Sequence, residues 1–269
     1  MRTLQADPTH RQLMYDSYLT ADLLENCRRF ASGSEFSEVR NLIRKYAKDA
    51  ATILDIPGGN GIATYAFSQA GFGVTAVEPD PSNLVGRGAI RHVLAAASLP
   101  GDIVAAYGEA LPFPDNTFDM VYVRQGLHHA RDLNAMLREY GRVTKCGGLL
   151  LACREPVVDD HGPSLRTFLD SQPDHQLYGG ENAFTFAEYR SAIRNAGFDL
   201  VLQIPPYSNP INLHPYDDES LAARILASTP GRALGVFLPK RLVVFLGRMH
   251  LRHGRRAGRL YSFVATKPR

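Results

Sequence analysis

The 269-residue chain contains no tryptophan and only three cysteines, Cys27, Cys146 and Cys153. These cysteines are widely spaced and odd in number, which argues against a disulfide framework and a zinc site and favours a reducing compartment. No apolar run approaches the roughly 20 residues of a membrane span. The first twelve residues are polar and lack the apolar segment of a signal peptide. We therefore expect a cytoplasmic protein without a metal site.

Acidic residues are absent from the last fifty positions. From Ser220 to Arg269 there is no Asp or Glu but eleven Lys and Arg, whereas residues 1–219 carry 27 acidic and 19 basic residues. The whole chain is 45% hydrophobic and 21% charged, as in ordinary globular proteins, so disorder is excluded as its main state. A basic segment after an acidic body is informative about binding partners and not about the fold.

Short apolar runs alternate with helical patterns along the chain. Helical spacing of apolar residues is found in 12–31 and 35–48 and, further along, in 62–70, 133–143 and 186–196. The predicted strands are 51–56, 73–77, 103–105, 118–123, 148–153, 200–204 and 260–266. Strands that alternate with helices indicate a parallel sheet covered on both faces.

The pattern predicts an α/β fold: a Rossmann-like seven-stranded, mostly parallel sheet with helices on both faces, an N-terminal helical cap and a late helical insertion. The expected units are a cap or lid at 1–34, the nucleoside-binding core at 35–204, a loop and basic helical insertion at 205–259, and the last core strand at 260–269. Tyr15, Tyr18 and Phe30 belong either to the lid or to the core packing.

A glycine-rich turn, Pro57-Gly58-Gly59-Asn60-Gly61, follows the first predicted strand and precedes a helix. Glycines let a ligand approach the backbone, and a helix N-terminus presents unpaired N–H groups. Glu78 ends the next strand, where a carboxylate can accept hydrogen bonds from the two ribose hydroxyls. Thr64 occupies the third glycine position of a dinucleotide site, so a nucleoside that carries a carboxylate is favoured over a pyrophosphate.

The segment from Leu54 to Gly61 resembles the first motif of class I S-adenosylmethionine (SAM)-dependent methyltransferases, and Glu78 matches that family's ribose-binding acid. The runs 111–119, 127–129 and 195–198 are similar to later landmarks of its small-molecule branch. The resemblance covers about residues 35–204. Two positions depart from it: Pro57 replaces the usual first glycine, and Tyr107 stands where many relatives have an adenine-binding Asp.

The resemblance implies SAM as cofactor and S-adenosylhomocysteine as product. The cofactor-binding residues that it implies are Asp55, Pro57, Gly58, Gly59, Gly61, Glu78, Pro79, Tyr107, Gly108, Glu109, Arg124 and Gln125. Among these, Asp55 and the glycine loop would lie near the methionine moiety and Glu78 on the ribose. Tyr107, Gly108 and Glu109 would border the adenine, with either Tyr107 stacking on it or Glu109 bonding to its amino group. Arg124 and Gln125 would form the floor beneath the sulfonium.

His128 and His129 are the candidate catalytic bases, because an imidazole titrates near neutral pH and the pair follows the fourth strand. The alternative is that the pair only packs or hydrogen-bonds the loop. The further polar candidates near the acceptor are Glu155, Asp159, Asp160 and His161, with His175 and Tyr178 after them.

A basic helix is expected between Pro239 and Gly254. A stripe of arginines (Arg241, Arg248, Arg252 and Arg255) lies beside an apolar face (Leu242, Phe245, Leu246 and Met249). Three interpretations remain open: a solvated face of a core helix, a site for an acceptor that bears phosphate or carboxylate, and peripheral contact with an anionic membrane that delivers a lipophilic acceptor. No nucleic-acid partner is expected.

The function predicted from the sequence is transfer of a methyl group from SAM to a small-molecule acceptor, at oxygen. Two alternatives remain: an NAD-dependent oxidoreductase, against which Thr64 argues, and a SAM-binding protein that does no methyl transfer.

Overall fold

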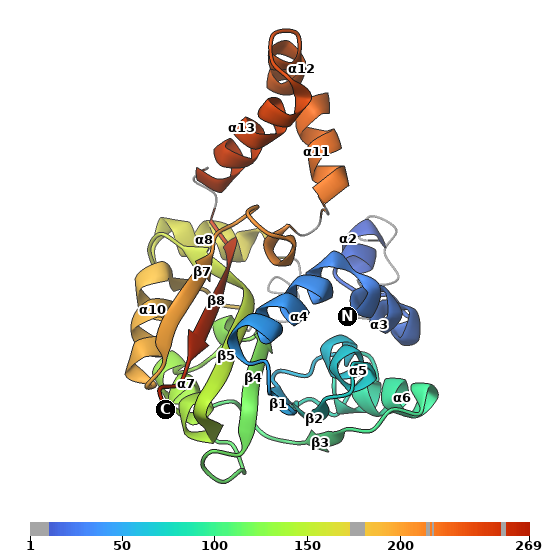
Figure 1. The fold of residues 1–269 in the computed structure, drawn as a ribbon, viewed down its shortest axis with the longest axis vertical. Coiled ribbons are helices and arrows are strands. Elements are labelled where there is room, and N and C mark those ends of the chain that lie inside the picture. Colours follow the sequence, from blue (N-terminus) through green and yellow to red (C-terminus); the bar gives the residue numbers. More distant parts are fainter. Residues whose placement is uncertain (1–10, 173–180, 214–215, 217, 254–256) are drawn as a thin grey trace.

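The computed structural model of the chain describes residues 11–172, 181–213, 216, 218–253 and 257–269. Its centre is a single sheet in the order β3-β2-β1-β4-β5-β8-β7, with the short β6 paired to β5 (Figure 1). The strands are β1 (Thr52–Asp55), β2 (Gly73–Val77), β3 (Asp102–Val104), β4 (Phe118–Arg124), β5 (Thr144–Val158), β6 (Phe184–Thr185), β7 (Asp199–Ile204) and β8 (Arg259–Thr266). β8 runs antiparallel to both β5 and β7, and the other pairs are parallel.

The predicted α/β, Rossmann-like fold is therefore confirmed. The sheet has eight strands where seven were expected, because the two-residue β6 pairs with the end of β5. β5 itself is longer than predicted and continues through Arg154, whose φ is +63°, in the region where its register with β8 shifts. The extension matters for the site, because it carries Glu155 and Pro156 beyond the end of β4.

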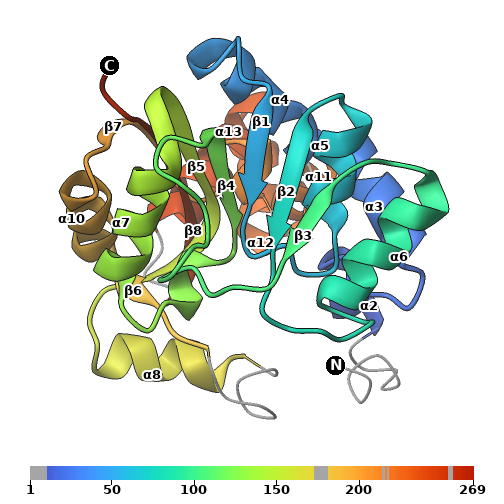
Figure 2. The same cartoon turned by 90° about the horizontal axis from the view of Figure 1, so that it is seen from below.

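Helices cover both faces of this sheet. In chain order they are α2 (Arg11–Asp16), α3 (Leu23–Ser32), α4 (Ser34–Tyr46), α5 (Ile62–Gln69), α6 (Arg87–Ala97), α7 (Leu133–Val143), α8 (Pro163–Asp170), α10 (Phe186–Asn195), α11 (Asp218–Ala227), α12 (Thr229–Gly235) and α13 (Lys240–His253). Ile53 and Tyr122 pack with α3, α4 and α5, whereas their neighbours Leu54 and Val121 pack with α7 and α10 on the opposite face. Successive strand residues are thus buried on alternate sides. α7 and α10 lie side by side (Figure 2).

The N-terminal segment differs from the single helix predicted for 12–31. The chain forms α2 and α3 with a break between them, where Tyr18 adopts a φ of +59°. Asp22 then caps α3 by accepting a hydrogen bond from the Glu25 amide at 2.9 Å. The apolar periodicity continues through the break, so the sequence pattern alone does not reveal it. α6 and α8 were not predicted.

The late insertion forms three helices where one was predicted. α13 begins at Lys240, directly after Pro239 as expected, and its predicted end at Gly254 lies outside the described residues. α13 packs on α11 through Val243 and Ile225, and the missing side chain of Gly247 leaves room for Ile225. α11, α12 and α13 project beyond the sheet, with α12 at the far end (Figure 1). None of the described helices combines the length and apolar character needed to cross a bilayer.

Candidate active site

The glycine loop joins the end of β1 to α5. Gly59 and Gly61 have φ values of +54° and +89°, in the left-handed region that favours glycine. A Cβ on Gly59 would meet no atom within 4 Å, so the loop backbone is open to a ligand at that residue. A Cβ on Gly61 would lie 2.9 Å from Val93, so this glycine also permits close packing of α6. The loop therefore has one open position and one packed position.

Glu78 points toward this loop. Its carboxylate accepts hydrogen bonds from the Gly59 amide at 2.9 Å and from the Asp80 amide at 3.0 Å. Burial raises the pKa of Glu78 and outweighs these two bonds, which lower it. A carboxylate offers about four acceptor positions, so two remain for hydroxyl donors. Pro79 follows it directly, and the carbonyl oxygens of Glu78 and Pro79 both accept from the Arg87 guanidinium.

Asp55 lies beneath the loop, with only 1% of its surface exposed. Its Oδ2 accepts a hydrogen bond from the Thr64 hydroxyl at 2.6 Å. Burial, together with the nearby Glu78 charge, raises the pKa of Asp55 to about 7. Thr64, which the sequence marked only as a departure from the dinucleotide pattern, thus fixes the first acid of the motif. Pro57 packs against Gly126, where an added Cβ would collide with the Pro57 ring.

The expected adenine-binding residues lie after β3. Tyr107 is 59% exposed, and the Arg131 guanidinium lies 5.5 Å from its ring centroid. The Glu109 carboxylate accepts from the Arg131 amide at 2.9 Å. Gly108 is buried, and a Cβ there would lie 2.7 Å from the Tyr140 hydroxyl. An exposed ring beside a carboxylate can border a purine, and both adenine-binding alternatives stay predictions.

Arg124 and Gln125 lie at the end of β4, and the Arg124 guanidinium donates to the Gln125 side-chain oxygen at 3.3 Å. The Arg124 guanidinium forms two hydrogen bonds with Glu35, at 2.7 and 3.1 Å, and Arg154 donates to the same carboxylate at 2.8 Å. Although burial alone would raise it, the pKa of Glu35 is lowered by the two arginines. The buried group of two arginines and one glutamate joins α4 to β4 and β5, with Glu35 and Arg154 lining a cavity of about 310 Å³. The predicted contact of Arg124 with the cofactor stays a prediction.

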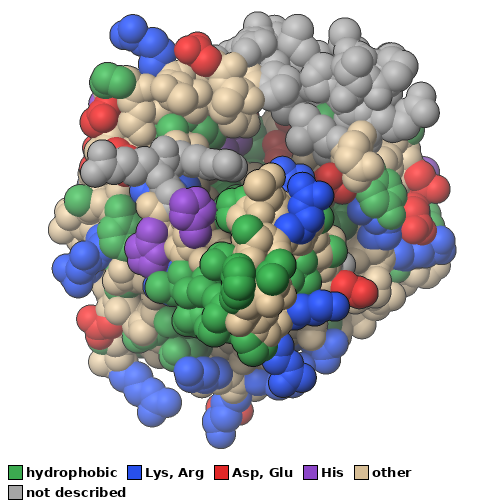
Figure 3. All heavy atoms as spheres, turned by 90° about the horizontal axis from the view of Figure 1, so that it is seen from above, with side chains coloured by type: hydrophobic (Ala, Val, Ile, Leu, Met, Phe, Trp, Pro, Cys, Tyr) green, Lys and Arg blue, Asp and Glu red, His purple; other side chains and the backbone are tan. Residues whose placement is uncertain are grey.

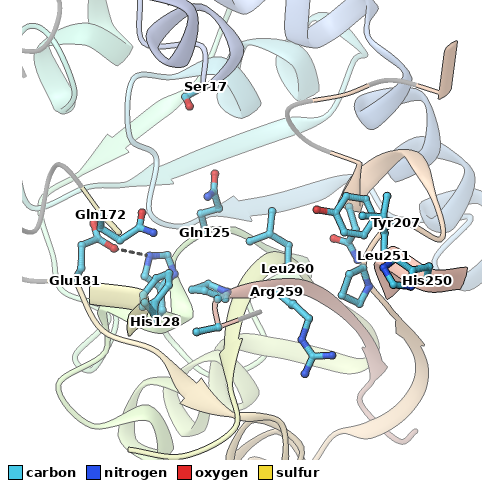
Figure 4. A pocket seen from close by; sticks show the side chains of 16 residues that line it. Ser17, Gln125, His128, Gln172, Glu181, Tyr207, His250, Leu251, Arg259 and Leu260 are labelled. Carbon is cyan, nitrogen blue, oxygen red and sulfur yellow. Dashed lines mark ion pairs between the residues drawn. The ribbon is translucent and has the colours of Figure 1, made fainter. Parts of the chain in front are cut away.

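Gln125 instead lines a different cavity of about 360 Å³ (Figure 4). Its walls include the end of β4, Pro156 of β5, Arg259 and Leu260 of β8, and His250 and Leu251 of α13. Gln125 is the neighbour of Gly126, which contacts Pro57 of the glycine loop. The carboxyl end of β4 therefore lies between the loop and the cavity. In open α/β sheets, ligands bind at the carboxyl ends of the strands, where the strand order reverses.

His128 lines this cavity, and buried Glu155 fixes the orientation of its imidazole ring. Its Nδ1 lies 3.0 Å from the fully buried Glu155 carboxylate, which also accepts from the backbone amides of Gly126, Leu127 and His128. Its Nε2 lies 3.3 Å from Glu181, as the dashed line in Figure 4 shows. Burial lowers the pKa of His128, but the hydrogen bonds to Glu155 and Glu181 override it and raise the value to about 9. Glu155 thus orients the imidazole, and Nε2 is directed toward the cavity.

His129 is exposed, and its ring centroid lies 4.1 Å from that of His128. His128, His129 and Glu181 have ligand atoms that all lie within 4.8 Å of one another, so among the described residues they are a group able to hold a metal ion. Ion pairing with Glu155 and Glu181 accounts for the position of His128, and His129 stacks on its ring. The sequence prediction of no metal site therefore stays as it was.

The other polar candidates lie outside the cavity wall. Asp159 pairs with Arg259 at 3.1 Å, Asp160 caps the start of α8, and His161 pairs with Glu188 at 2.9 Å. His175 and Tyr178 lie outside the described residues. In the N-terminal segment, Phe30 is fully buried, Tyr18 packs against it, and Tyr15 stacks with Arg29. Sequence reasoning missed Glu181, which no local motif marks.

The chain is similar to known proteins in sequence and in fold. Residues 54–152 match the family described as "Methyltransferase domain". A curated relative, the ubiquinone/menaquinone biosynthesis C-methyltransferase of Enterobacter sp. strain 638, is 37% identical over 114 residues, which are 40% of this chain and 45% of that protein. The chain thus matches less than half of the length of this curated relative.

Solved structures share the fold over most of the chain. A [4+2]-cyclase superposes with a TM-score of 0.56 at 19% identity, covering 86% of this chain and 80% of that one. A geranyl diphosphate methyltransferase in complex with sinefungin, a SAM analogue, superposes with a TM-score of 0.57 at 14% identity, covering 87% and 78%. At this identity the similarity shows the fold alone.

The glycine loop, the facing acid and the matched domain define the class. The chain contains a class I SAM-dependent methyltransferase domain, as its motifs predicted, and its cofactor is SAM. The match disfavours the NAD-dependent oxidoreductase alternative.

Proposed function

We propose that this chain transfers a methyl group from SAM to a small-molecule acceptor that binds in the cavity beside Gln125 and His128. The observation that supports the proposal is the contact between Pro57 of the glycine loop and Gly126, because Gly126 directly follows Gln125 of the cavity wall. SAM supplies a methyl group on a sulfonium, so the protein mainly has to position the two reactants.

The residues of the loop fit a nucleoside of this kind. Gly59 leaves open space over the backbone, and Glu78 keeps acceptor capacity for two hydroxyls after its bonds to Gly59 and Asp80. We propose that Glu78 holds the ribose, that the methionine end lies over the open backbone at Gly59, and that Tyr107 borders the adenine.

The atom that receives the methyl group is oxygen in this proposal. In its neutral form, His128 takes the proton of an acceptor hydroxyl at Nε2 in place of its contact with Glu181, while Glu155 holds Nδ1. With a pKa of about 9, His128 is mostly protonated at neutral pH, so methyl transfer should become faster as the pH rises toward 9 and the neutral imidazole becomes populated. The curated relative is named a C-methyltransferase, so carbon is the competing atom.

Labelled cofactor identifies the acceptor and tests the reaction. The protein is incubated with trideuteromethyl-SAM and a metabolite extract, and mass spectrometry searches for products that gain the labelled methyl group. We expect a labelled product together with S-adenosylhomocysteine, and neither with the Glu78→Ala variant. Tight SAM binding without S-adenosylhomocysteine would instead indicate a SAM-binding protein that does no methyl transfer. Fragmentation of the product distinguishes an O-methyl from a C-methyl group.

A further inference from the structure

Large apolar side chains are concentrated on the surface of the late insertion. Of the ten large hydrophobic residues that are exposed in the described part of the chain, seven lie between Leu234 and Met249. The two most exposed, Val236 at 75% and Phe237 at 84%, form the turn between α12 and α13. Scattered exposed residues are ordinary, but a contiguous group of this kind marks an interaction surface.

The packing of α13 explains why these residues are uncovered. Val243 and Gly247 face α11, where they pack against Ile225. The opposite side of α13 carries Leu242, Phe245, Leu246 and Met249, which follow the i, i+3, i+4, i+7 spacing of one helical face and are all exposed. Viewed onto the end of the insertion, hydrophobic side chains gather in one patch (Figure 3).

Basic side chains surround this patch. Arg232, Lys240 and Arg241 are all exposed, and they flank the turn at Val236 and Phe237 along the chain. Lys and Arg side chains rim the patch in Figure 3. The acids of the insertion that the structure describes, Asp218 and Glu219, lie at the start of α11, at the end away from α12.

The structure also refines the arginine stripe predicted from the sequence. Arg248 donates to Asp218 at 2.6 Å, so its charge is paired, and Arg252 is partly buried. Arg255 lies outside the described residues. Of the described residues of the predicted stripe, Arg241 is therefore the exposed cation near the apolar turn that forms no ion pair with another described residue.

We propose that this surface, residues 232–249, rests on an anionic lipid bilayer. Val236 and Phe237 would enter the boundary between headgroups and acyl chains, while Arg232, Lys240 and Arg241 contact the lipid phosphates. The charge pattern selects this occupant over a second copy of the chain, because two such surfaces facing each other would bring cations of like sign together. The contact is peripheral, since no described helix can span the membrane.

The same helix connects the surface with the acceptor cavity. Leu251 and His250 of α13 line the cavity, directly after the exposed Met249. A lipophilic acceptor could thus pass from the bilayer along α13 to the cavity beside His128. This second step rests on the proposed methyltransferase function, whereas membrane contact itself does not.

Vesicle sedimentation tests the contact. The full chain is mixed with vesicles of phosphatidylglycerol and phosphatidylcholine or of phosphatidylcholine alone, at low and high salt. We expect binding to the anionic vesicles that weakens in high salt. Replacing Val236 and Phe237 by serine should weaken it at least tenfold, roughly the value of burying one Phe side chain. The triple variant Arg232→Gln, Lys240→Gln, Arg241→Gln should weaken it by about fivefold per charge.

Matched controls use exposed residues away from the insertion. Val201→Ser on β7 and the triple change Arg40→Gln, Arg44→Gln, Lys45→Gln on α4 should bind vesicles as the wild type does. All variants should bind SAM normally by calorimetry, which separates this proposal from the proposed function. Absence of binding to anionic vesicles, or equal losses in the control variants, would overturn it. So would a dimer, measured by light scattering, that the V236S/F237S variant abolishes while vesicles are not bound.

Discussion

Replacing Glu78 by alanine is the sharpest test of the nucleoside site. The carboxylate has acceptor positions left for two ribose hydroxyls, and a hydrogen bond to a charged group contributes at least about 1.5 kcal/mol. Losing both should cost about 3 kcal/mol, which corresponds to a roughly 150-fold higher Kd for SAM. The released Gly59 amide adds to the loss, because the loop is no longer held toward β2.

The fold should tolerate this change. Burial raises the pKa of Glu78, so folding disfavours its ionised form and its removal takes away no stabilising charge. The two backbone hydrogen bonds that it accepts should account for a loss of about 1–2 kcal/mol in the free energy of unfolding. Thermal melting of the variant therefore shows whether the affinity is measured on folded protein.

Calorimetric titration with SAM is the assay, and Asp102→Ala is the control. Asp102 is an exposed acid at the amino end of the neighbouring β3, away from the glycine loop, so its variant should bind SAM as the wild type does. A folded Glu78→Ala variant whose Kd lies within about threefold of the wild-type value would refute the reasoning. It would mean that the carboxylate serves only to hold the Gly59 and Asp80 amides.

Two further predictions concern buried charges. Glu181→Gln should lower the pKa of His128 from about 9 by roughly one unit, because one of its two carboxylate partners is lost. NMR titration of the imidazole measures this pKa. An unchanged titration midpoint would contradict the pairing of His128 with Glu181. Glu35→Gln should lower the free energy of unfolding by about 3–5 kcal/mol, since Arg124 and Arg154 would then lack their counter-charge. The control is Asp49→Asn, which should change this free energy little because Asp49 is exposed. Denaturant unfolding measures both variants. The pKa of Glu35 is lowered, so its contribution is present at neutral pH and is lost as the pH falls through the acid range in which it protonates.

Much of the site was predictable because its signals are local. A strand, a glycine turn and a helix follow one another within Thr52–Gln69, and each glycine of the turn reflects a backbone requirement of that short segment. Glu78 was found because parallel strands bring their carboxyl ends to one edge of the sheet. The mostly parallel sheet with helices on both faces follows from the same alternation of strands and helices, whereas the strand order and the antiparallel β8 do not.

Other parts of the site depend on contacts between distant segments. Glu35 is 89 residues from Arg124 and 119 from Arg154, and no spacing rule joins them. The break between α2 and α3 also escaped prediction, because apolar periodicity reports which residues are buried and not whether the backbone continues as one helix.

The sequence by itself determined the fold class, the glycine loop with its facing acid, and the separation of a basic insertion from an acidic body. These properties are set by backbone preferences, apolar periodicity and composition, which are readable within one segment. Only the tertiary structure decided that His128 lies between Glu155 and Glu181, that Arg248 is neutralised by Asp218, and which face of α13 is uncovered. Charge pairing and exposure depend on which distant segments pack together, and that packing is a property of the whole chain.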